Sequence, residues 1–224
     1  MKPQKAYILR ISTDLSREYA EIAAESCRKL GIPYEFFEGI ENKTSYEAWT
    51  QSRLNVKMLG VYKTNNVDKA ACATVSHALL WKKILDNRET AIILEHDAVM
   101  LQPVDIDIPD ERIVVLGYKL SDISRYDHNK AGSPKELITI TGHEGAHAYA
   151  INWTTAAMML NELQTIGVSF PIDNTFFLKM RRSKVPLSIA SPTPAIAWLR
   201  KSTIWNESAE VNYEFIPSFS SHLK

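Results

Sequence analysis

Two acidic side chains at the end of one apolar run are the first candidates for chemistry. Residues 92–94 (IIL) lead directly into Glu95, His96 and Asp97. Because side chains alternate along a strand, we expect Glu95 and Asp97 to share a face while His96 points the other way. Two carboxylates at the carboxyl edge of a parallel sheet suit Mg²⁺ or Mn²⁺ held together with substrate phosphates. A solvated turn is the alternative, since acid-x-acid is a weak pattern by itself.

A helical pattern before this run carries polar residues of a second kind. Cys72 and Ser76 lie four residues apart and share a helix face, whereas His77 lies beside that face. The small residues around them allow the helix to pack closely against a sheet. We expect Ser76 and His77 to line or support the same pocket, and a buried core histidine is the alternative for His77.

A basic segment follows near the C-terminus. Between Asp173 and Glu207 there is no acidic residue, but there are several basic ones: Lys179, Arg181, Arg182, Lys184, Arg200 and Lys201. Such a segment can neutralise the charge of a diphosphate leaving group, and a solvated basic surface is the alternative. Arg181 and Arg182 cannot both face the same side of a helix, so at most one of them is a good candidate.

The periodicity of apolar residues predicts the elements that position these groups. Strands are expected at 6–11, 34–37, 90–94, 113–116, 137–141 and 146–151. Helices are expected at 15–30, 46–57, 68–87, 152–166 and near 173–180, with a long loop over 117–135. Because strands and helices alternate, we expect an α/β fold with a mixed, mostly parallel sheet flanked by helices.

Composition and charge exclude several classes of protein. The chain has 224 residues, of which 45% are hydrophobic, and it balances 26 Lys and Arg against 26 Asp and Glu. This balance argues against a general polyanion binder, so we expect no nucleic-acid partner. Only two cysteines, Cys27 and Cys72, are present, which favours a reducing compartment. With no transmembrane run and no signal peptide evident, we expect a cytoplasmic protein that can associate peripherally with a membrane.

Four ordered segments resemble glycosyltransferase family 25, the family of bacterial lipooligosaccharide and procollagen galactosyltransferases. The segments are 71–77 (ACATVSH), 93–98 (ILEHDA), 146–151 (AHAYAI) and 171–173 (PID). The beginning of the chain, with Arg17, and the 202–204 element (STI) are also similar. The acidic motif of the family is usually Glu-Asp-Asp, so His96 stands in place of the middle acid and leaves both outer carboxylates intact.

The resemblance implies a single GT-A-like domain over 1–224 that transfers a sugar, typically galactose, with inversion. The donor would be a nucleotide-diphosphate sugar, such as a UDP-sugar, with Mn²⁺ or Mg²⁺ as cofactor. A nucleotide-binding half would span about 1–100, and an acceptor half about 101–224. The acceptor would be a glycan, a lipid-linked glycan or a protein, as in lipopolysaccharide biosynthesis.

The resemblance also implies roles for single residues. Asp97, assisted by Glu95, would hold the metal, and Asp173 would be the general base, although an Asp at a helix start is also a routine cap. The expected donor-binding residues come from several segments: Ser12, Thr13, Arg17, Ser76, His77, Glu95, Arg181, Arg200 and Lys201. Two alternatives stay open. One is a catalytically silent GT-A-fold binding or adaptor protein, and the other is a metal-dependent nucleotidyl or phosphoryl transferase.

Overall fold

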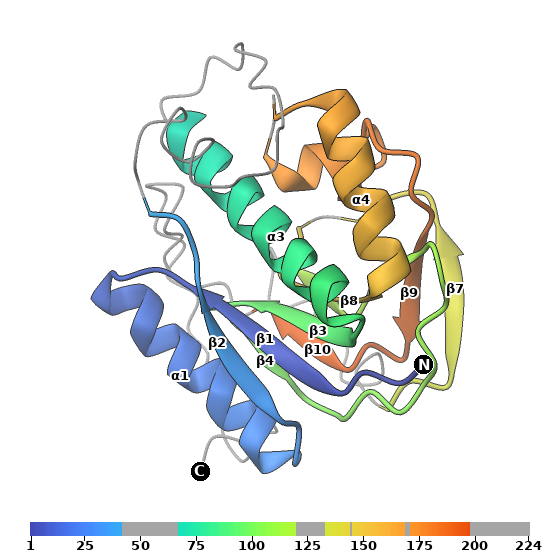
Figure 1. Ribbon diagram of the computed structural model, residues 1–224. Coiled ribbons are helices and arrows are strands. Elements are labelled where there is room, and N and C mark those ends of the chain that lie inside the picture. The colour runs from blue at the N-terminus through green and yellow to red at the C-terminus, as the bar shows by residue number, and fades with distance from the viewer. Residues whose placement is uncertain (42–66, 120–132, 144, 169–170, 198–224) are drawn as a thin grey trace.

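A seven-stranded sheet forms the centre of the molecule, in the order β2-β1-β3-β8-β5-β9-β7 (Figure 1). The computed structural model describes residues 1–41, 67–119, 133–143, 145–168 and 171–197. The strands of this sheet are β1 (Lys5–Arg10), β2 (Tyr34–Glu38), β3 (Thr90–Glu95), β5 (Ile113–Val115), β7 (Glu136–Ile140), β8 (Ala148–Asn152) and β9 (Leu187–Ser191). A second, three-stranded sheet contains β4 (Ala98–Met100), β10 (Ala195–Ala197) and β6 (Gly117–Lys119).

The large sheet is mixed, with β8 and β7 running against the other strands. β2, β1 and β3 are parallel neighbours, and β5 is parallel to β9. β8 pairs antiparallel with both β3 and β5, and β7 pairs antiparallel with β9. The expected α/β class, with a mixed and mostly parallel sheet flanked by helices, is therefore confirmed.

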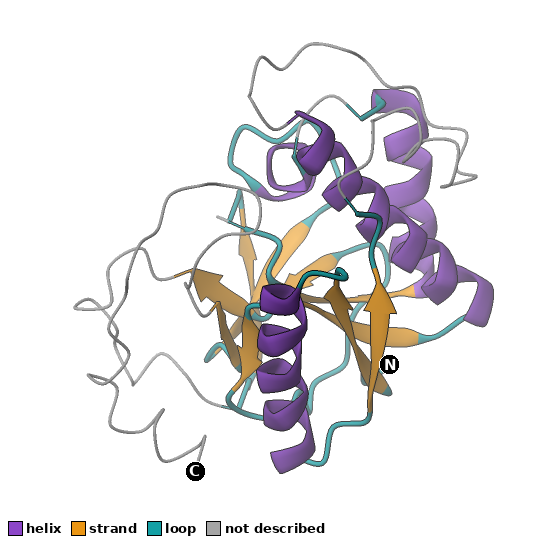
Figure 2. Ribbon diagram, turned by 90° about the vertical axis from the view of Figure 1, so that its left-hand side faces the viewer, coloured by secondary structure: helices purple, strands orange, loops and turns teal. Residues whose placement is uncertain are grey.

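Helices cover both faces of this sheet. They are α1 (Asp14–Lys29), α3 (Val67–Asn87) and α4 (Trp153–Ile166), together with a π-helical turn, η3 (Asp173–Phe177). The small residues Ala20, Ala23 and Ala24 let α1 approach one face closely. On the opposite face α3 and α4 lie side by side (Figure 1). Figure 2, turned so that the α1 side faces the viewer, shows this helix separated from the others by the strands.

This arrangement opens a crevice at one edge of the sheet. The chain leaves β1 into α1 on one face and enters β3 from α3 on the other face. From β1 the chain moves outward to β2 and then crosses back past β1 to β3, so the strand order reverses between β1 and β3. Open α/β sheets bind ligands at such a switch point.

Several expectations about elements need correction. The strands expected at 137–141 and 146–151 form as β7 and β8, but these two strands are separated in the sheet by β5 and β9. The loop expected over 117–135 begins with a strand, β6, and two strands that were not expected from the sequence, β9 and β10, follow residue 180. β6 and β10 have only three residues each, too few for a pattern of alternation to be read from the sequence. The helix expected at 46–57 lies outside the described residues.

None of the described helices combines the length and the apolar character that a bilayer crossing requires.

Candidate functional site

A cavity of about 370 Å³ lies at the carboxyl ends of β1 and β3. Its walls come from the end of β1, the first residues of α1, one face of α3 and the turn after β3. Five residues expected from the sequence line it together: Thr13, Ser76, His77, Glu95 and Asp97. The cavity therefore occupies the switch point of the sheet and contains both candidate metal-binding carboxylates.

The turn after β3 places its three polar residues differently from the expectation. β3 ends at Glu95, and His96 and Asp97 form a turn that leads into β4 of the second sheet. Strand alternation stops there, so His96 does not point away but lines the cavity with its neighbours. Its ring also stacks on Tyr19 of α1, with 6.1 Å between centroids. His96 thus joins the turn to α1.

His77 holds the carboxylate of Glu95. The Nε2 atom of His77 lies 3.1 Å from Oε1 of Glu95, and the His77 ring is fully buried. Burial would raise the pKa of Glu95, but the hydrogen bond from His77, with the nearby His147 and His96, holds that pKa below its usual range. Glu95 is therefore a carboxylate at neutral pH, as a ligand for a cation must be.

Thr13 and Ser76 have structural contacts as well as positions in the cavity wall. Thr13 caps α1, since its side chain accepts a hydrogen bond from the backbone N–H of Ser16 at 3.3 Å. The Ser76 hydroxyl accepts from the backbone N–H of Ile40 at 2.8 Å and donates to the carbonyl of Cys72 at 2.7 Å. Ser76 therefore fastens α3 to the segment that follows β2.

Three expected donor-binding residues of the described chain do not line this cavity. Ser12 and Arg17 are exposed at the start of α1, outside the cavity wall. The guanidinium of Arg181 instead donates to the carbonyl oxygens of Thr141 and Val185, so it holds its own loop. Arg200 and Lys201 lie outside the described residues.

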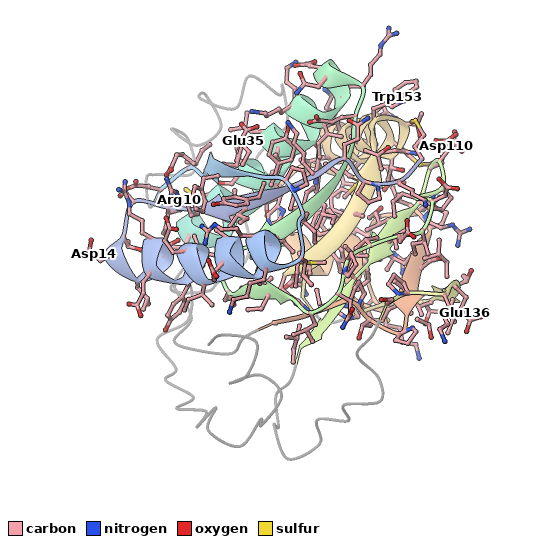
Figure 3. All side chains as sticks on the ribbon, turned by 90° about the horizontal axis from the view of Figure 1, so that it is seen from below. Arg10, Asp14, Glu35, Asp110, Glu136 and Trp153 are labelled. Atoms are coloured by element: carbon pink, nitrogen blue, oxygen red, sulfur yellow. The ribbon has the colours of Figure 1, made fainter. Side chains whose placement is uncertain are left out.

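Two cations that sequence reasoning missed do line the cavity. Arg10 is the last residue of β1, and Lys69 lies in the first turn of α3. The Arg10 guanidinium bonds Glu38 at 2.6 Å and lies 3.8 Å from the centroid of Phe36, which fixes its position. Figure 3 labels Arg10 on the same side of the molecule as Asp14, at the start of α1. Lys69 could have been found from its spacing, three residues before Cys72 on the same helix face.

Asp173 is half-buried and starts η3, outside the wall of this cavity. Ile172 occupies the cap position of this turn, and Asp173 is the acidic residue of its first turn. Burial raises the pKa of Tyr149 well above its ordinary value, and the charges of Glu95 and Asp173 raise it further. Both carboxylates therefore act on one tyrosine, which lies between the candidate metal site and the candidate base.

The donor atoms at the cavity fit a metal that is shared with a substrate. No group of three or more His, Cys, Asp or Glu side chains in the described segments is arranged to hold a metal ion. Glu95 and Asp97 nevertheless supply two carboxylates in one wall. Mg²⁺ at phosphate-transfer sites is bound by one or two carboxylates plus substrate phosphates and waters. The residues suit that arrangement and not a closed protein cage.

Every residue that lines the cavity falls between Leu9 and Asp97. Residues 4–108 match glycosyltransferase family 25, described as an LPS biosynthesis protein family. This match confirms the resemblance inferred from the sequence motifs and supports a role in glycosyl transfer. The family 25 match contains the whole cavity and ends well before Asp173.

A solved structure described as a glycosyltransferase involved in the glycosylation of the major capsid of PBCV-1 is also similar. It aligns with 86% of this chain and 93% of its own, at 9% identity and a TM-score of 0.43. Comparison with curated protein sequences finds no match.

Proposed function

We propose that this chain is an inverting, metal-dependent glycosyltransferase of the GT-A type. It would move a hexose, such as galactose, from a UDP-sugar or similar donor to a hydroxyl of a glycan, lipid-linked glycan or protein. The observation that supports this most is the cavity, because it lies at the switch point and combines Glu95 and Asp97 with Arg10 and Lys69. Such a site complements both a divalent cation and an anionic diphosphate.

Asp97 and Glu95 would hold the Mn²⁺ or Mg²⁺. When bound, the metal offsets the negative charge that develops on the diphosphate as it leaves. Lys69 provides a second positive charge in the same wall and would contact the phosphates. Arg10 is oriented by Glu38 and would border the nucleotide.

Asp173 would accept the proton of the attacking hydroxyl. Attack by that oxygen on the anomeric carbon, opposite the leaving diphosphate, inverts the configuration and needs a base on the acceptor side. Asp173 lies outside the cavity wall, on the segment after α4, so the base and the donor site come from different halves of the chain. We propose a cytoplasmic site of action, with peripheral membrane association for a lipid-linked acceptor.

A screen of nucleotide sugars with and without Mn²⁺ tests this function. The purified protein should release a nucleoside diphosphate from at least one donor, as detected by mass spectrometry. Asp97→Asn should lower the rate about 100-fold, because charge stabilisation of the leaving group is lost. Asp86→Asn is the matched control, since Asp86 is exposed and, among the described residues, bonds Lys82 of its own helix.

The other two functions predict different products. Release of pyrophosphate would identify a nucleotidyl transferase. No turnover and no metal-dependent donor binding would identify a silent binding protein.

A further inference from the structure

A chain of buried polar groups connects Glu95 to the interior of the molecule. The indole N–H of Trp81 donates to the Tyr149 hydroxyl at 2.7 Å. That hydroxyl lies 2.9 Å from Nδ1 of His77, whose Nε2 lies 3.1 Å from Glu95. Trp81, Tyr149 and His77 are all fully buried. Two residues of α3, one of β8 and one of β3 thus form a single hydrogen-bonded row.

When the His77 ring is neutral, the donors and acceptors in this row determine where each hydrogen lies. An indole N–H can only donate and an ionised carboxylate can only accept. The Tyr149 oxygen therefore accepts from Trp81, and its own hydrogen is donated to Nδ1 of His77. Nε2 of His77 must then carry the ring hydrogen and donate it to Glu95. The opposite tautomer would leave Nε2 and the carboxylate facing each other without a hydrogen between them.

The same turn that begins at Asp173 packs against this row. Phe177 contacts the ring of Tyr149 edge-on, with 5.2 Å between centroids, and Phe176 contacts Trp81 at 5.0 Å. Both Phe side chains are fully buried. Because aromatic contacts of this geometry restrict ring orientation, η3 immobilises the tyrosine and the tryptophan. Burial also raises the pKa of Tyr149, so the phenol keeps the hydrogen that it donates.

We propose that Trp81, Tyr149 and His77 are positioning residues, which orient the Glu95 carboxylate toward the metal and the diphosphate. Their role resembles that of outer partners of metal ligands, which orient the ligand and whose loss costs about 10- to 100-fold in affinity or activity. Their catalytic consequence rests on the proposed function. The position of the hydrogen on the His77 ring does not rest on it, because that position follows from the contacts of a neutral ring with Tyr149 and with the Glu95 carboxylate.

Nitrogen NMR of the histidine rings tests the row without any substrate. His77 is assigned by comparison with the His77→Gln variant. The wild-type ring should show a protonated Nε2 and an unprotonated Nδ1. In Tyr149→Phe the donor to Nδ1 is lost, but Glu95 still requires the hydrogen on Nε2, so the Nε2–H tautomer should persist while the Nδ1 resonance shifts. An Nδ1–H tautomer or a doubly protonated ring in the wild-type protein would overturn the proposal.

Kinetics of the same variant test the positioning role. Tyr149→Phe should raise the donor KM and the apparent metal dissociation constant about tenfold, with the acceptor KM unchanged. Tyr7→Phe is the matched control, because Tyr7 is equally buried and bonds Glu89. Glu89 directly precedes β3, whereas Glu95 is the last residue of that strand. It should lose stability but keep the wild-type donor and metal affinity. Equal affinity losses in both variants would show a merely structural role.

Two substitutions of His77 test whether an N–H group facing Glu95 is sufficient to restore donor binding. His77→Gln keeps an N–H for Glu95, whereas His77→Leu has none, so the donor KM should rise less for Gln than for Leu. Equal rises in two folded variants would contradict the proposal. If the wild-type protein turns over no nucleotide sugar, the proposed function fails while the NMR result still decides the His77 tautomer.

Discussion

At the scale of single residues, two buried tyrosines that flank β3 at the same level of the sheet show how a partner changes the role of a carboxylate. The Tyr7 hydroxyl bonds Glu89 directly, and burial followed by this bond raises its pKa to about 12. Tyr149 reaches Glu95 only through His77. The interposed imidazole supplies an N–H to the carboxylate and leaves Glu95 at the cavity wall, where it can meet a cation.

The ion pair between Glu35 and Lys83, near the amino end of β2, allows the contribution of charge to stability to be tested at a single residue. Its hydrogen bond to Lys83 is the main cause that holds the pKa of Glu35 below its ordinary value. For an acid whose pKa is lowered by folding, the stabilisation is present above the unfolded pKa and is lost as pH falls through the folded value. Lys83→Met should therefore lower the free energy of unfolding by less than about 1 kcal/mol at neutral pH, since the pair is partly exposed.

Urea unfolding at neutral and at acidic pH measures this effect. The difference between wild type and Lys83→Met should vanish once Glu35 is protonated. Lys82→Met is a control for an exposed pair within α3, formed with Asp86, and should cost less at neutral pH. A Lys83 effect that persists undiminished in acid would show that packing, and not charge, is responsible.

At the scale of elements, the position of η3 depends on a close backbone approach. A side chain at Gly142 would overlap the backbone of Leu178 and Lys179, the two residues that follow η3. The backbone N–H of His143 also donates to the carbonyl of Phe177 at 2.7 Å. The connection that follows β7 therefore lies tightly against the end of the turn that begins at Asp173.

Gly142→Ala should displace this turn. The expected loss of stability is about 1–3 kcal/mol, the range for forcing added atoms into a packed site, measured by urea unfolding. Because Phe176 and Phe177 move with the turn, the donor KM should also rise. Thr141→Ala changes the neighbouring exposed side chain and should affect neither quantity. Identical behaviour of the two variants would refute the close-approach argument.

At the scale of the whole molecule, the candidate site is assembled from two distant parts of the chain. The family 25 match over residues 4–108 contains the cavity, whereas Asp173 belongs to the later segment. Tyr149 connects them, since it bonds His77 and packs on Phe177. This division predicts that donor binding and proton removal can be separated by mutation.

Asp173→Asn should abolish transfer while sparing donor binding. Loss of a general base costs about 10²- to 10⁴-fold in rate. A donor at about 100 times its dissociation constant should still stabilise the variant by about 2.7 kcal/mol, as in the wild type. Transfer assays and thermal unfolding with the donor and Mn²⁺ measure the two properties. Asp105→Asn, an exposed acid paired with Lys2, is the control, and substantial transfer by Asp173→Asn would exclude the base role.

The sequence by itself determined the α/β class, the bounds of α1, α3 and α4 within a few residues, and the acidic residues at the end of β3. These features depend on local periodicity and on capping residues such as Asn152, which accepts from the backbone N–H of Thr155. The family resemblance was also visible, because its motifs are continuous segments.

Only the tertiary structure decided which side chains meet. It inserted β8 antiparallel between β3 and β5, and so brought Tyr149 to His77, 72 positions earlier in the chain. It also placed Arg10 and Lys69 in the cavity wall and left Arg181 outside it. Strand pairing and contacts between buried polar groups depend on segments that are distant in sequence, so no local pattern contains them.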